Sequence, residues 1–372
     1  MLRIYNLTFN LHAMHKQLKR FALVLLAGII WSCGLLRAAG LAAASDSPAL
    51  SPTDDPQDTT LRVLCIGNSY TLDATRYLER MAQQAGLEAA QYGICCVIHG
   101  GASLEYWSNH LAQNREIEEM YGMGGSLQPE NKHWTLRELL REPWDVVVLQ
   151  QCSKQSDNYS FYSPHADMLV NTIRQECPNP EVKLAWHMTW SHALTFSCKP
   201  YSRKGWKNIG EAVQQLLGGG GFDVLIPSGT AIQNARAFTD DYQELTRDGT
   251  HIAYGAGHYL LALTWFETLV APAFGVSLMG VPPSAALCEA NADKRPFFPV
   301  TEENWAKFQE CVACAISSPF ELAPFAIPYQ SSQHLYRLRF TEEPLYDLSG
   351  RRLSRPLVKG MYICGKEKCF VR

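Results

Sequence analysis

The segment Arg62–Gly67 (RVLCIG) is a short apolar run that ends at a glycine and leads directly into residues 68–71 (NSYT). A run of this length and composition is typical of a strand that is buried on both faces, as in a parallel sheet. Apolar residues then recur at helical spacing from Leu72 to Met81. The segment therefore predicts a strand, a turn and a helix in succession, with Ser69 at the turn.

Four further apolar runs have the character of buried strands, and helical stretches lie between them. The strands are predicted at Tyr92–Ile98, Trp144–Leu149, Val182–His187 and Phe222–Ile226, and the helices at Leu136–Leu140, His165–Glu176, Trp206–Leu217, Tyr254–Leu269 and Trp305–Ile316. Strands that alternate with helices indicate an α/β layered domain with a mainly parallel sheet of five strands.

In such a sheet the functional site lies at the carboxyl ends of the strands. The segments that follow the predicted strands are rich in Ser, Gln, His and Gly, whereas the strands themselves are apolar. These segments are Gly67–Thr71, His99–Ser103, Gln150–Ser156, His187–His192 and Pro227–Gln233. We expect the chemistry of this protein at that edge.

Composition and motifs exclude several classes of function. The 372 residues are 47% hydrophobic and carry a net charge of −3, which indicates a folded protein without the basic footprint of a nucleic-acid partner. The chain has no phosphate-binding loop and no HExxH helix. Cys311 and Cys314 form a CxxC without a second ligand pair, which favours structural thiols over a redox or metal site. We expect neither a metal nor a cofactor.

Two short motifs suggest nucleophilic catalysis. Ser69 follows the first strand directly, where its hydroxyl would be exposed at the carboxyl edge; the alternative is a serine that caps the helix. Asp248-Gly249-Thr250-His251 places a carboxylate three residues before a histidine; the alternative is a surface turn with a capping Asp. A serine nucleophile needs a base, and the base needs a carboxylate that holds its tautomer, so the two motifs complement each other.

The order of these motifs resembles the SGNH (GDSL-type) hydrolase superfamily. Within it the chain is similar to a secreted subfamily with GNSY (residues 67–70) and DGTH (248–251) blocks, and the resemblance covers about residues 61–269. The resemblance implies a three-layer α/β/α fold with a flavodoxin-like sheet. It also implies Ser69 as nucleophile, His251 as general base and Asp248 as the orienting carboxylate.

The same resemblance implies an oxyanion hole made by the backbone N–H of Ser69, a glycine of the second block and an amide of the third. Gly101 is the preferred glycine and Gly100 the alternative, because Gly100 is expected to form the bend after the strand. Where the superfamily has G-x-N-D, this chain has QQCS (residues 150–153), and its first block has Asn68 in place of Asp. Gln151 is the expected donor, with Gln150 and Ser153 as alternatives. Removing one such donor typically costs about 10²- to 10³-fold in rate.

Further polar residues at strand ends are candidates for substrate binding, although each could also be structural: Gln150, His187, Trp190 and Arg236. The expected function is hydrolysis of a small acyl ester, with O-acetyl on a carbohydrate as the expected substrate, by a Ser-His-Asp mechanism. The choice of a carbohydrate rests on the expected export of the protein and on analogy with the family that it resembles. The alternatives are a non-catalytic glycan-binding or surface protein on the same fold, and acyl transfer; oligomeric state is left open.

The two ends of the chain indicate export. Residues 1–44 have a basic region, the uncharged run Phe21–Leu36 and an A-x-A pattern at 42–44, as in a secretory signal peptide rather than a stable membrane span. A second interpretation is lipoprotein anchoring at Cys33. Residues 45–60 are predicted to be a linker, 61–320 the hydrolase-like domain, and 330–372 a β-rich tail that resembles a type IX (Por) secretion sorting tail.

Overall fold

The computed structural model describes residues 60–125, 133–193, 202–238 and 245–326, together with 345–346, 352–353, 360–364 and 367–371 near the C-terminus. The predicted signal peptide, Cys33 and all of the predicted linker except Thr60 lie outside the described residues, so these assignments stay predictions. None of the helices in the described ranges combines the length and the hydropathy that crossing a membrane requires.

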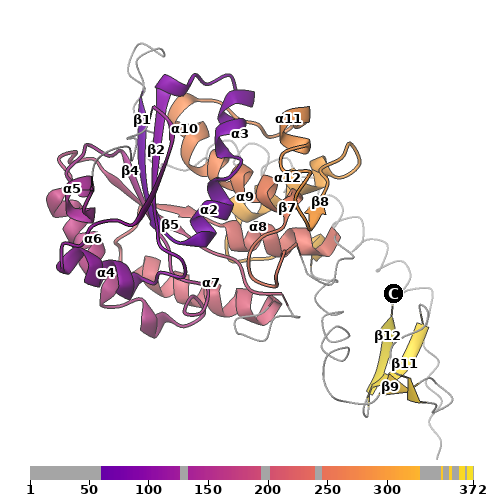
Figure 1. The fold of residues 1–372 in the computed structure, drawn as a ribbon. Helices are drawn as coiled ribbons and strands as arrows, with labels where there is room; N and C mark the ends of the chain where they lie inside the picture. Colours follow the sequence, from indigo (N-terminus) through magenta and orange to yellow (C-terminus); the bar gives the residue numbers. More distant parts are fainter. Residues whose placement is uncertain are drawn as a thin grey trace, which may run out of the picture. The chain divides into compact units, whose positions relative to one another are not determined.

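A six-stranded sheet forms the centre of the main domain, with the strand order β3-β2-β1-β4-β5-β6 (Figure 1). The strands are β1 (Leu61–Gly67), β2 (Tyr92–Ile98), β3 (Glu119–Gly124), β4 (Val146–Leu149), β5 (Lys183–His187) and β6 (Val224–Ile226). All pairings except that of β3 are parallel. The five predicted strands are therefore confirmed, and their order is the flavodoxin-like one.

The prediction of five strands is wrong by one, because β3 pairs antiparallel with β2 at the edge of the sheet. Its sequence, EMYGMG, contains two glycines, and its residues are only partly buried or exposed. An edge strand that is half open to solvent has no continuous apolar run, which was the signal that identified the other strands.

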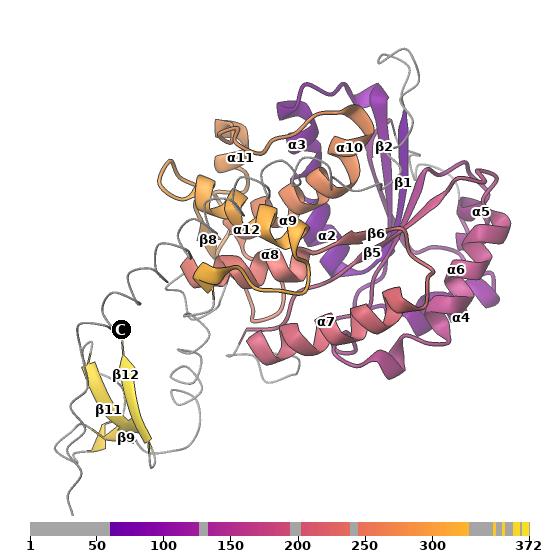
Figure 2. The same cartoon turned by 180° about the vertical axis from the view of Figure 1, so that it is seen from behind.

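Helices cover both faces of the sheet, as a three-layer arrangement requires (Figures 1 and 2). On one face a single hydrophobic core joins alternate strand residues, such as Leu64, Ile66 and Trp186, to four helices. These helices are α4 (Leu104–Ala112), α5 (Leu136–Leu140), α6 (His165–Glu176) and α7 (Ser202–Gly218).

On the other face α2 (Ser69–Thr75) packs on β1 and β2, and α9 (Ala256–Trp265) packs on α2 and on α3 (Leu78–Gln84); α8 (Ser228–Ala235) and α12 (Trp305–Ser317) pack on α9 and on each other. The predicted helix Tyr254–Leu269 is present as α9, whose ten residues are all buried, followed by the π-helical turn η4 (Phe266–Val270). The smaller elements are α10 (Ala271–Phe274), α11 (Ala285–Cys288), the strands β7 (Tyr254–Gly255) and β8 (Phe297–Phe298), and the 3₁₀ turns η1 (Ala89–Gln91), η2 (Tyr159–Phe161), η3 (Arg236–Phe238) and η5 (Pro324–Ala326).

The C-terminal tail contains a small antiparallel sheet of its own, in the order β10-β9-β11-β12. Its strands are β9 (Leu345–Tyr346), β10 (Arg352–Leu353), β11 (Gly360–Cys364) and β12 (Glu367–Val371). The expected β-rich character of the tail is confirmed for these residues. Its use as a sorting signal stays a prediction.

The topology determines where a site can form. The chain passes from β1 to β2 on one side of β1, and β4 lies on the other side, so β1 stands at the point where the strand order reverses. Loops that leave neighbouring strands in opposite directions open a crevice at such a point. The loop after β1, which contains Ser69, lies at this position.

Candidate active site

The loop between β1 and α2 presents Ser69. Asn68 has an extended backbone (φ −147°, ψ −161°) and caps α2, because its Oδ1 accepts a hydrogen bond from the N–H of Tyr70 at 2.9 Å. Ser69 is the first residue of the helix and is only partly buried. The interpretation of Ser69 as the capping residue is therefore wrong, and its hydroxyl is available for another partner.

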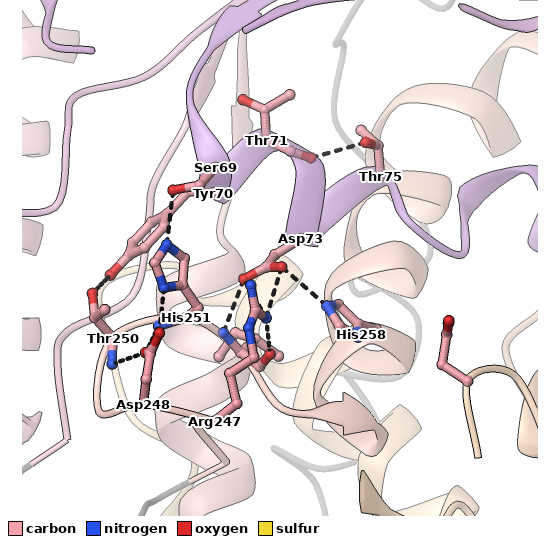
Figure 3. A network of polar contacts seen from close by, with 12 residues as sticks. Ser69, Tyr70, Thr71, Asp73, Thr75, Arg247, Asp248, Thr250, His251 and His258 are labelled. Atoms are coloured by element: carbon pink, nitrogen blue, oxygen red, sulfur yellow. Dashed lines mark hydrogen bonds and ion pairs between the residues drawn. The ribbon is translucent and has the colours of Figure 1, made fainter. Parts of the chain in front are cut away.

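That partner is His251, and Asp248 lies behind it (Figure 3). The Nε2 atom of His251 is 2.9 Å from Ser69 Oγ, and its Nδ1 atom is 2.7 Å from Asp248 Oδ2. Since an ionised carboxylate can only accept, Nδ1 carries the proton and Nε2 accepts from the serine hydroxyl. A serine in this arrangement can attack a carbonyl carbon while the imidazole removes its proton.

Asp248 and His251 are held in a closed loop. An antiparallel bridge joins Thr246 to Ile252, and the N–H of Arg247 donates to the carbonyl of His251 at 2.8 Å. The Oδ1 atom of Asp248 accepts from the backbone N–H groups of Thr250 (3.0 Å) and His251 (2.7 Å). Asp248 therefore caps this turn with one oxygen and holds the His251 ring with the other, so both of its predicted roles are combined.

The carboxylate of Asp248 is adapted to stay ionised. Partial burial raises its pKa, but the hydrogen bonds from the His251 ring and from the backbone N–H groups of His251 and Thr250 outweigh this effect. The pKa of Asp248 is consequently below its ordinary value. Its side chain is 47% exposed and that of His251 is 28% exposed, so the pair is open to solvent on one side.

Tyr70 and Trp190 contact the loop 248–251 through Thr250. Their rings stack at a centroid distance of 4.0 Å, the hydroxyl of Tyr70 is 2.8 Å from Thr250 Oγ1, and the indole N–H of Trp190 donates to the carbonyl of Thr250 at 2.7 Å. Burial raises the pKa of Tyr70 well above its ordinary value, so its hydroxyl stays protonated. Thr250 is thus held in the middle of the segment that carries Asp248 and His251.

The second block forms a tight turn beside Ser69. The N–H of Ala102 donates to the carbonyl of His99 at 3.0 Å, and Gly101 has a positive φ of +72°, as in the third position of a type II turn. The bend therefore places its left-handed residue at Gly101 and not at Gly100. Among the described residues, none accepts a hydrogen bond from the N–H of Gly101 or of Ser69.

The third block is occupied by internal contacts. The Nε2 atom of Gln151 donates to the carbonyl of Phe161 at 2.8 Å, and its Oε1 accepts from the N–H groups of Leu104 and Cys152. Gln150 donates to Asn68 Oδ1 at 2.7 Å. In this arrangement neither amide points a free donor at Ser69, and Ser153, the third alternative, lies beside the hydroxyl of Tyr70.

The four residues expected to bind substrate lie in the interior. Gln150, His187, Trp190 and Arg236 are each 2% exposed or less. The Nδ1 atom of His187 donates to Gln150 Oε1 at 2.8 Å, and the guanidinium of Arg236 donates to the hydroxyl and carbonyl of Ser191 at 2.8 Å. These side chains connect loops in the interior, and their buried positions do not expose them to a substrate.

Sequence reasoning missed a second polar cluster, formed by Asp73, Arg247 and His258 (Figure 3). Asp73 lies on α2 one helical turn after Ser69 and is fully buried. Burial alone would raise its pKa, but the hydrogen bond from His258 and the charge of Arg247 lower it below its ordinary value. The available signal was a charged residue four positions after the candidate nucleophile, on the helix face that packs inward.

The open side of the site borders the end of β2. The N–H of His99 donates to the carbonyl of Gly67 at 3.4 Å, which brings the two strand ends together. The His99 ring stacks on Tyr106 at 4.3 Å, and its Nδ1 is 3.1 Å from the exposed carboxylate of Glu118.

Within the described ranges, no three His, Cys, Asp or Glu side chains are grouped in a way that could hold a metal ion.

Comparison with known proteins identifies relatives of this chain. A family model described as "Domain of unknown function (DUF4886)" matches residues 62–278, which is more than half of the chain and includes Ser69, Asp248 and His251. A crystal structure of a DUF4886 family protein from Bacteroides uniformis has 28% sequence identity and a TM-score of 0.55, and the match covers 71% of this chain and 97% of that chain. No curated protein matches significantly.

Two more distant structures are also similar to this chain. One is a proposed acylhydrolase from Bacteroides fragilis, with 14% identity, a TM-score of 0.34, and coverage of 64% of this chain and 96% of that chain. The other is a gut microbial diltiazem-metabolizing enzyme, with 12% identity, a TM-score of 0.37, and coverage of 59% and 48%. At these scores neither structure carries an argument about the reaction.

Proposed function

The chain belongs to the DUF4886 family, and we propose that it is an SGNH-type serine hydrolase that cleaves a small acyl ester. The observation that carries this proposal is the continuous chain of contacts from Ser69 Oγ through His251 to Asp248, with distances of 2.9 and 2.7 Å. Two segments that are far apart in the sequence supply these groups. A protein that only binds a ligand has no need of a serine and an imidazole in this relation.

The reaction then follows from the atoms. Ser69 Oγ attacks the ester carbonyl carbon as His251 Nε2 takes its proton, and the imidazolium is stabilised by Asp248. Collapse of the tetrahedral intermediate breaks the bond to the alcohol, which receives the proton from Nε2. Water, activated by the same nitrogen, then hydrolyses the acyl-serine and restores the enzyme.

For the oxyanion we propose the backbone N–H groups of Ser69 and Gly101 as the principal donors. Both belong to loops at the carboxyl edge, and neither N–H has a partner among the described residues. Gln151 can serve as a third donor only if its amide leaves the carbonyl of Phe161. A hole with two donors stabilises the transition state less than one with three, by about 3 kcal/mol.

We further propose that the substrate is an O-acetylated carbohydrate outside the cytoplasm. The support is the signal-peptide pattern of residues 1–44, the sequence pattern of the predicted tail at 330–372 and the partial solvent exposure of His251 and Asp248, which gives an ester on a bulky molecule access to the serine. Lipid anchoring at Cys33 is the alternative route to the cell surface.

The test is hydrolysis of p-nitrophenyl acetate, butyrate and octanoate by the purified protein, with acetylated xylan and acetylated chitooligosaccharides as carbohydrate esters. Turnover of the acetyl esters that disappears in Ser69→Ala supports the proposal. Ser160→Ala, which removes an exposed hydroxyl, is the matched control and should keep full activity. A wild-type protein that releases no acid from any of these esters would point instead to the non-catalytic glycan-binding alternative.

A further inference from the structure

Asp73 contacts both ends of the segment that carries the general base. Its Oδ2 accepts from the N–H of Ile252 at 3.0 Å, and both of its oxygens accept from Nη1 of Arg247, at 2.9 and 3.1 Å. Arg247 immediately precedes Asp248, and Ile252 immediately follows His251. One carboxylate on α2 therefore grips the residue before and the residue after the four-residue segment Asp248–His251 (Figure 3).

We propose that Asp73 is a positioning residue, a clamp that sets the distance between Ser69 on α2 and His251 in the loop. The proposal rests on the hydrolase function proposed above. Ser69 and Asp73 are four residues apart and lie on one side of a rigid helical turn. Asp73 thus fixes the position of the loop relative to α2, the helix that carries Ser69.

The geometry of the loop makes this clamp effective. Arg247 Nη1 also donates to the carbonyl of Ile252, so the guanidinium crosses the base of the loop from one end to the other. Together with the bridge between Thr246 and Ile252, the carboxylate of Asp73 and the guanidinium of Arg247 close the two ends of the loop that carries His251. We infer that movement of these two loop ends relative to α2 would change the distance between Nε2 of His251 and Oγ of Ser69.

Burial makes the clamp stiff. The side chain of Asp73 is 1% exposed, and that of Arg247 is 21% exposed. A charge-assisted hydrogen bond removed from water is stronger than one at the surface, and a buried carboxylate without its partners is strongly unfavourable. Asp73 consequently favours a single arrangement of Arg247 and Ile252, whereas the solvent-exposed Asp248 does not constrain the loop as tightly.

His258 completes the carboxylate's shell without touching the loop segment. Its Nε2 is 3.2 Å from Asp73 Oδ1, and it lies on the fully buried helix α9. Burial lowers the pKa of His258 despite the neighbouring carboxylate, so the ring is neutral and donates a hydrogen bond without adding a charge. His258 supports Asp73, and its removal should affect catalysis less than removal of Asp73 or Arg247.

The experiment compares Asp73→Asn with the control Asp145→Asn. Asn at position 73 keeps the shape but turns an N–H₂ group toward the donors Arg247 or Ile252. Asp145 is a partly buried carboxylate that, like Asp73, accepts a backbone N–H, here that of Arg62 at 2.7 Å, but it precedes β4 and so lies at the amino-terminal end of the parallel strands, opposite the end that carries Ser69. Both variants lose a structural anion, and only one of them loses the clamp.

The readouts are kcat and KM for p-nitrophenyl acetate, and the ring NMR signals of His251 in histidine-labelled protein, assigned with His251→Gln. We expect kcat to fall by about 10²-fold in Asp73→Asn with KM within threefold, because a misplacement of about 1 Å costs that much. The His251 signals should shift or broaden in this variant. Asp145→Asn should leave kcat and these signals unchanged although it lowers the melting temperature.

A folded Asp73→Asn variant with wild-type kcat and unchanged His251 signals would overturn the proposal, as would an equal loss in Asp145→Asn. If Asp73→Asn does not fold, Arg247→Lys takes its place, since it keeps the charge but cannot reach both Asp73 and Ile252. If the wild type hydrolyses no ester, the hydrolase function fails and the NMR comparison alone decides whether Asp73 positions His251.

Discussion

Asp248 uses its two carboxylate oxygens for different tasks. Oδ1 accepts from the turn, and within the described part of the chain the hydrogen bond of Oδ2 is the one to the imidazole of His251. The proton on Nδ1 therefore depends on this one oxygen. In the proposed reaction Asp248 acts through the tautomer and orientation of His251. Because its side chain is 47% exposed, we expect the ion pair itself to add little to the stability of the fold.

Replacement of Asp248 by Asn should reverse the tautomer. An amide that caps the turn with its oxygen presents N–H₂ to Nδ1, which places the imidazole proton on Nε2 and removes the base that faces Ser69. We expect kcat for p-nitrophenyl acetate to fall by about 10³- to 10⁴-fold with little change in KM. Steady-state kinetics beside Asp167→Asn, an exposed carboxylate on α6, measures this. A loss below tenfold would mean that Asp248 does not orient the base.

Gln151 offers a test of the oxyanion hole. In Gln151→Glu the side chain keeps an acceptor for the N–H groups of Leu104 and Cys152 but loses the donor that contacts Phe161. If two backbone donors suffice, kcat should change by less than about tenfold while the melting temperature falls. A loss of about 10²- to 10³-fold in kcat without a change in stability would show that the amide moves to the oxyanion.

At the scale of elements, Asn68 connects three loops that the sheet brings together. It caps α2, accepts from Gln150 Nε2, and donates through Nδ2 to the carbonyl of Ala102 at 2.9 Å. The superfamily that the chain resembles has Asp in this block. Here an aspartate would face the carbonyl of Ala102 with an acceptor, so the second block would lose its tie to the nucleophile loop.

Asn68→Asp should therefore be destabilising although it restores the residue expected from the resemblance. The bonds from Tyr70 and Gln150 survive, but the lost bond leaves the buried carbonyl of Ala102 without a donor and facing a carboxylate oxygen, at a cost of about 2–3 kcal/mol in the free energy of unfolding. Urea unfolding monitored by tryptophan fluorescence measures the change. A variant as stable as the wild type would contradict the proposed tie between the two blocks.

The elements that sequence reasoning predicted and those it missed differ in burial. The parallel strands have uninterrupted apolar runs, since both faces are covered, and each was predicted near its observed position. β3 is open on one side and its EMYGMG sequence has no such run. The DxxH loop was predicted as a pair of residues, but its closure by Asp73 was not, because Asp73 belongs to neither motif and its contact with Ile252 joins positions 179 residues apart.

The candidate site divides in the same way. Ser69, Asp248 and His251 were predicted from local motifs, and the structure brings them together. Whether an amide or a guanidinium faces the solvent or the interior depends on packing between distant strands. This is why His187 and Arg236 were assigned to substrate contact and Gln151 to the oxyanion hole, although each is at most 1% exposed.

For the whole molecule, the buried histidines link stability to pH. Burial lowers the pKa of His187 to about 3, because the charged ring would lose its hydration in the core, and its Nε2 has no hydrogen-bond partner among the described residues. The unfolded chain, with an ordinary pKa near about 6.5, binds this proton first as the pH falls. The stability that depends on the neutral ring is thus full above about pH 6.5 and is lost progressively toward pH 3.

We expect the free energy of unfolding to decrease by up to about 1.4 kcal/mol per pH unit below pH 6 through His187 alone, with His258 acting in the same direction. In His187→Asn, whose amide can still donate to Gln150, this slope should be smaller by about one proton. Unfolding curves at pH 4.5, 5.5, 6.5 and 7.5 give the slope. An equal slope in both proteins would mean that His187 is not buried in its neutral form.

The central claim is that Ser69 is an activated nucleophile, and covalent labelling tests it most directly. The purified protein is incubated with a fluorophosphonate probe, digested, and mapped by mass spectrometry, beside Ser69→Ala and His251→Gln. The account predicts one adduct on Ser69, none in Ser69→Ala, and strongly slowed labelling in His251→Gln. A wild-type protein that stays unlabelled at a large excess of probe, or an adduct that maps to another residue, would contradict it.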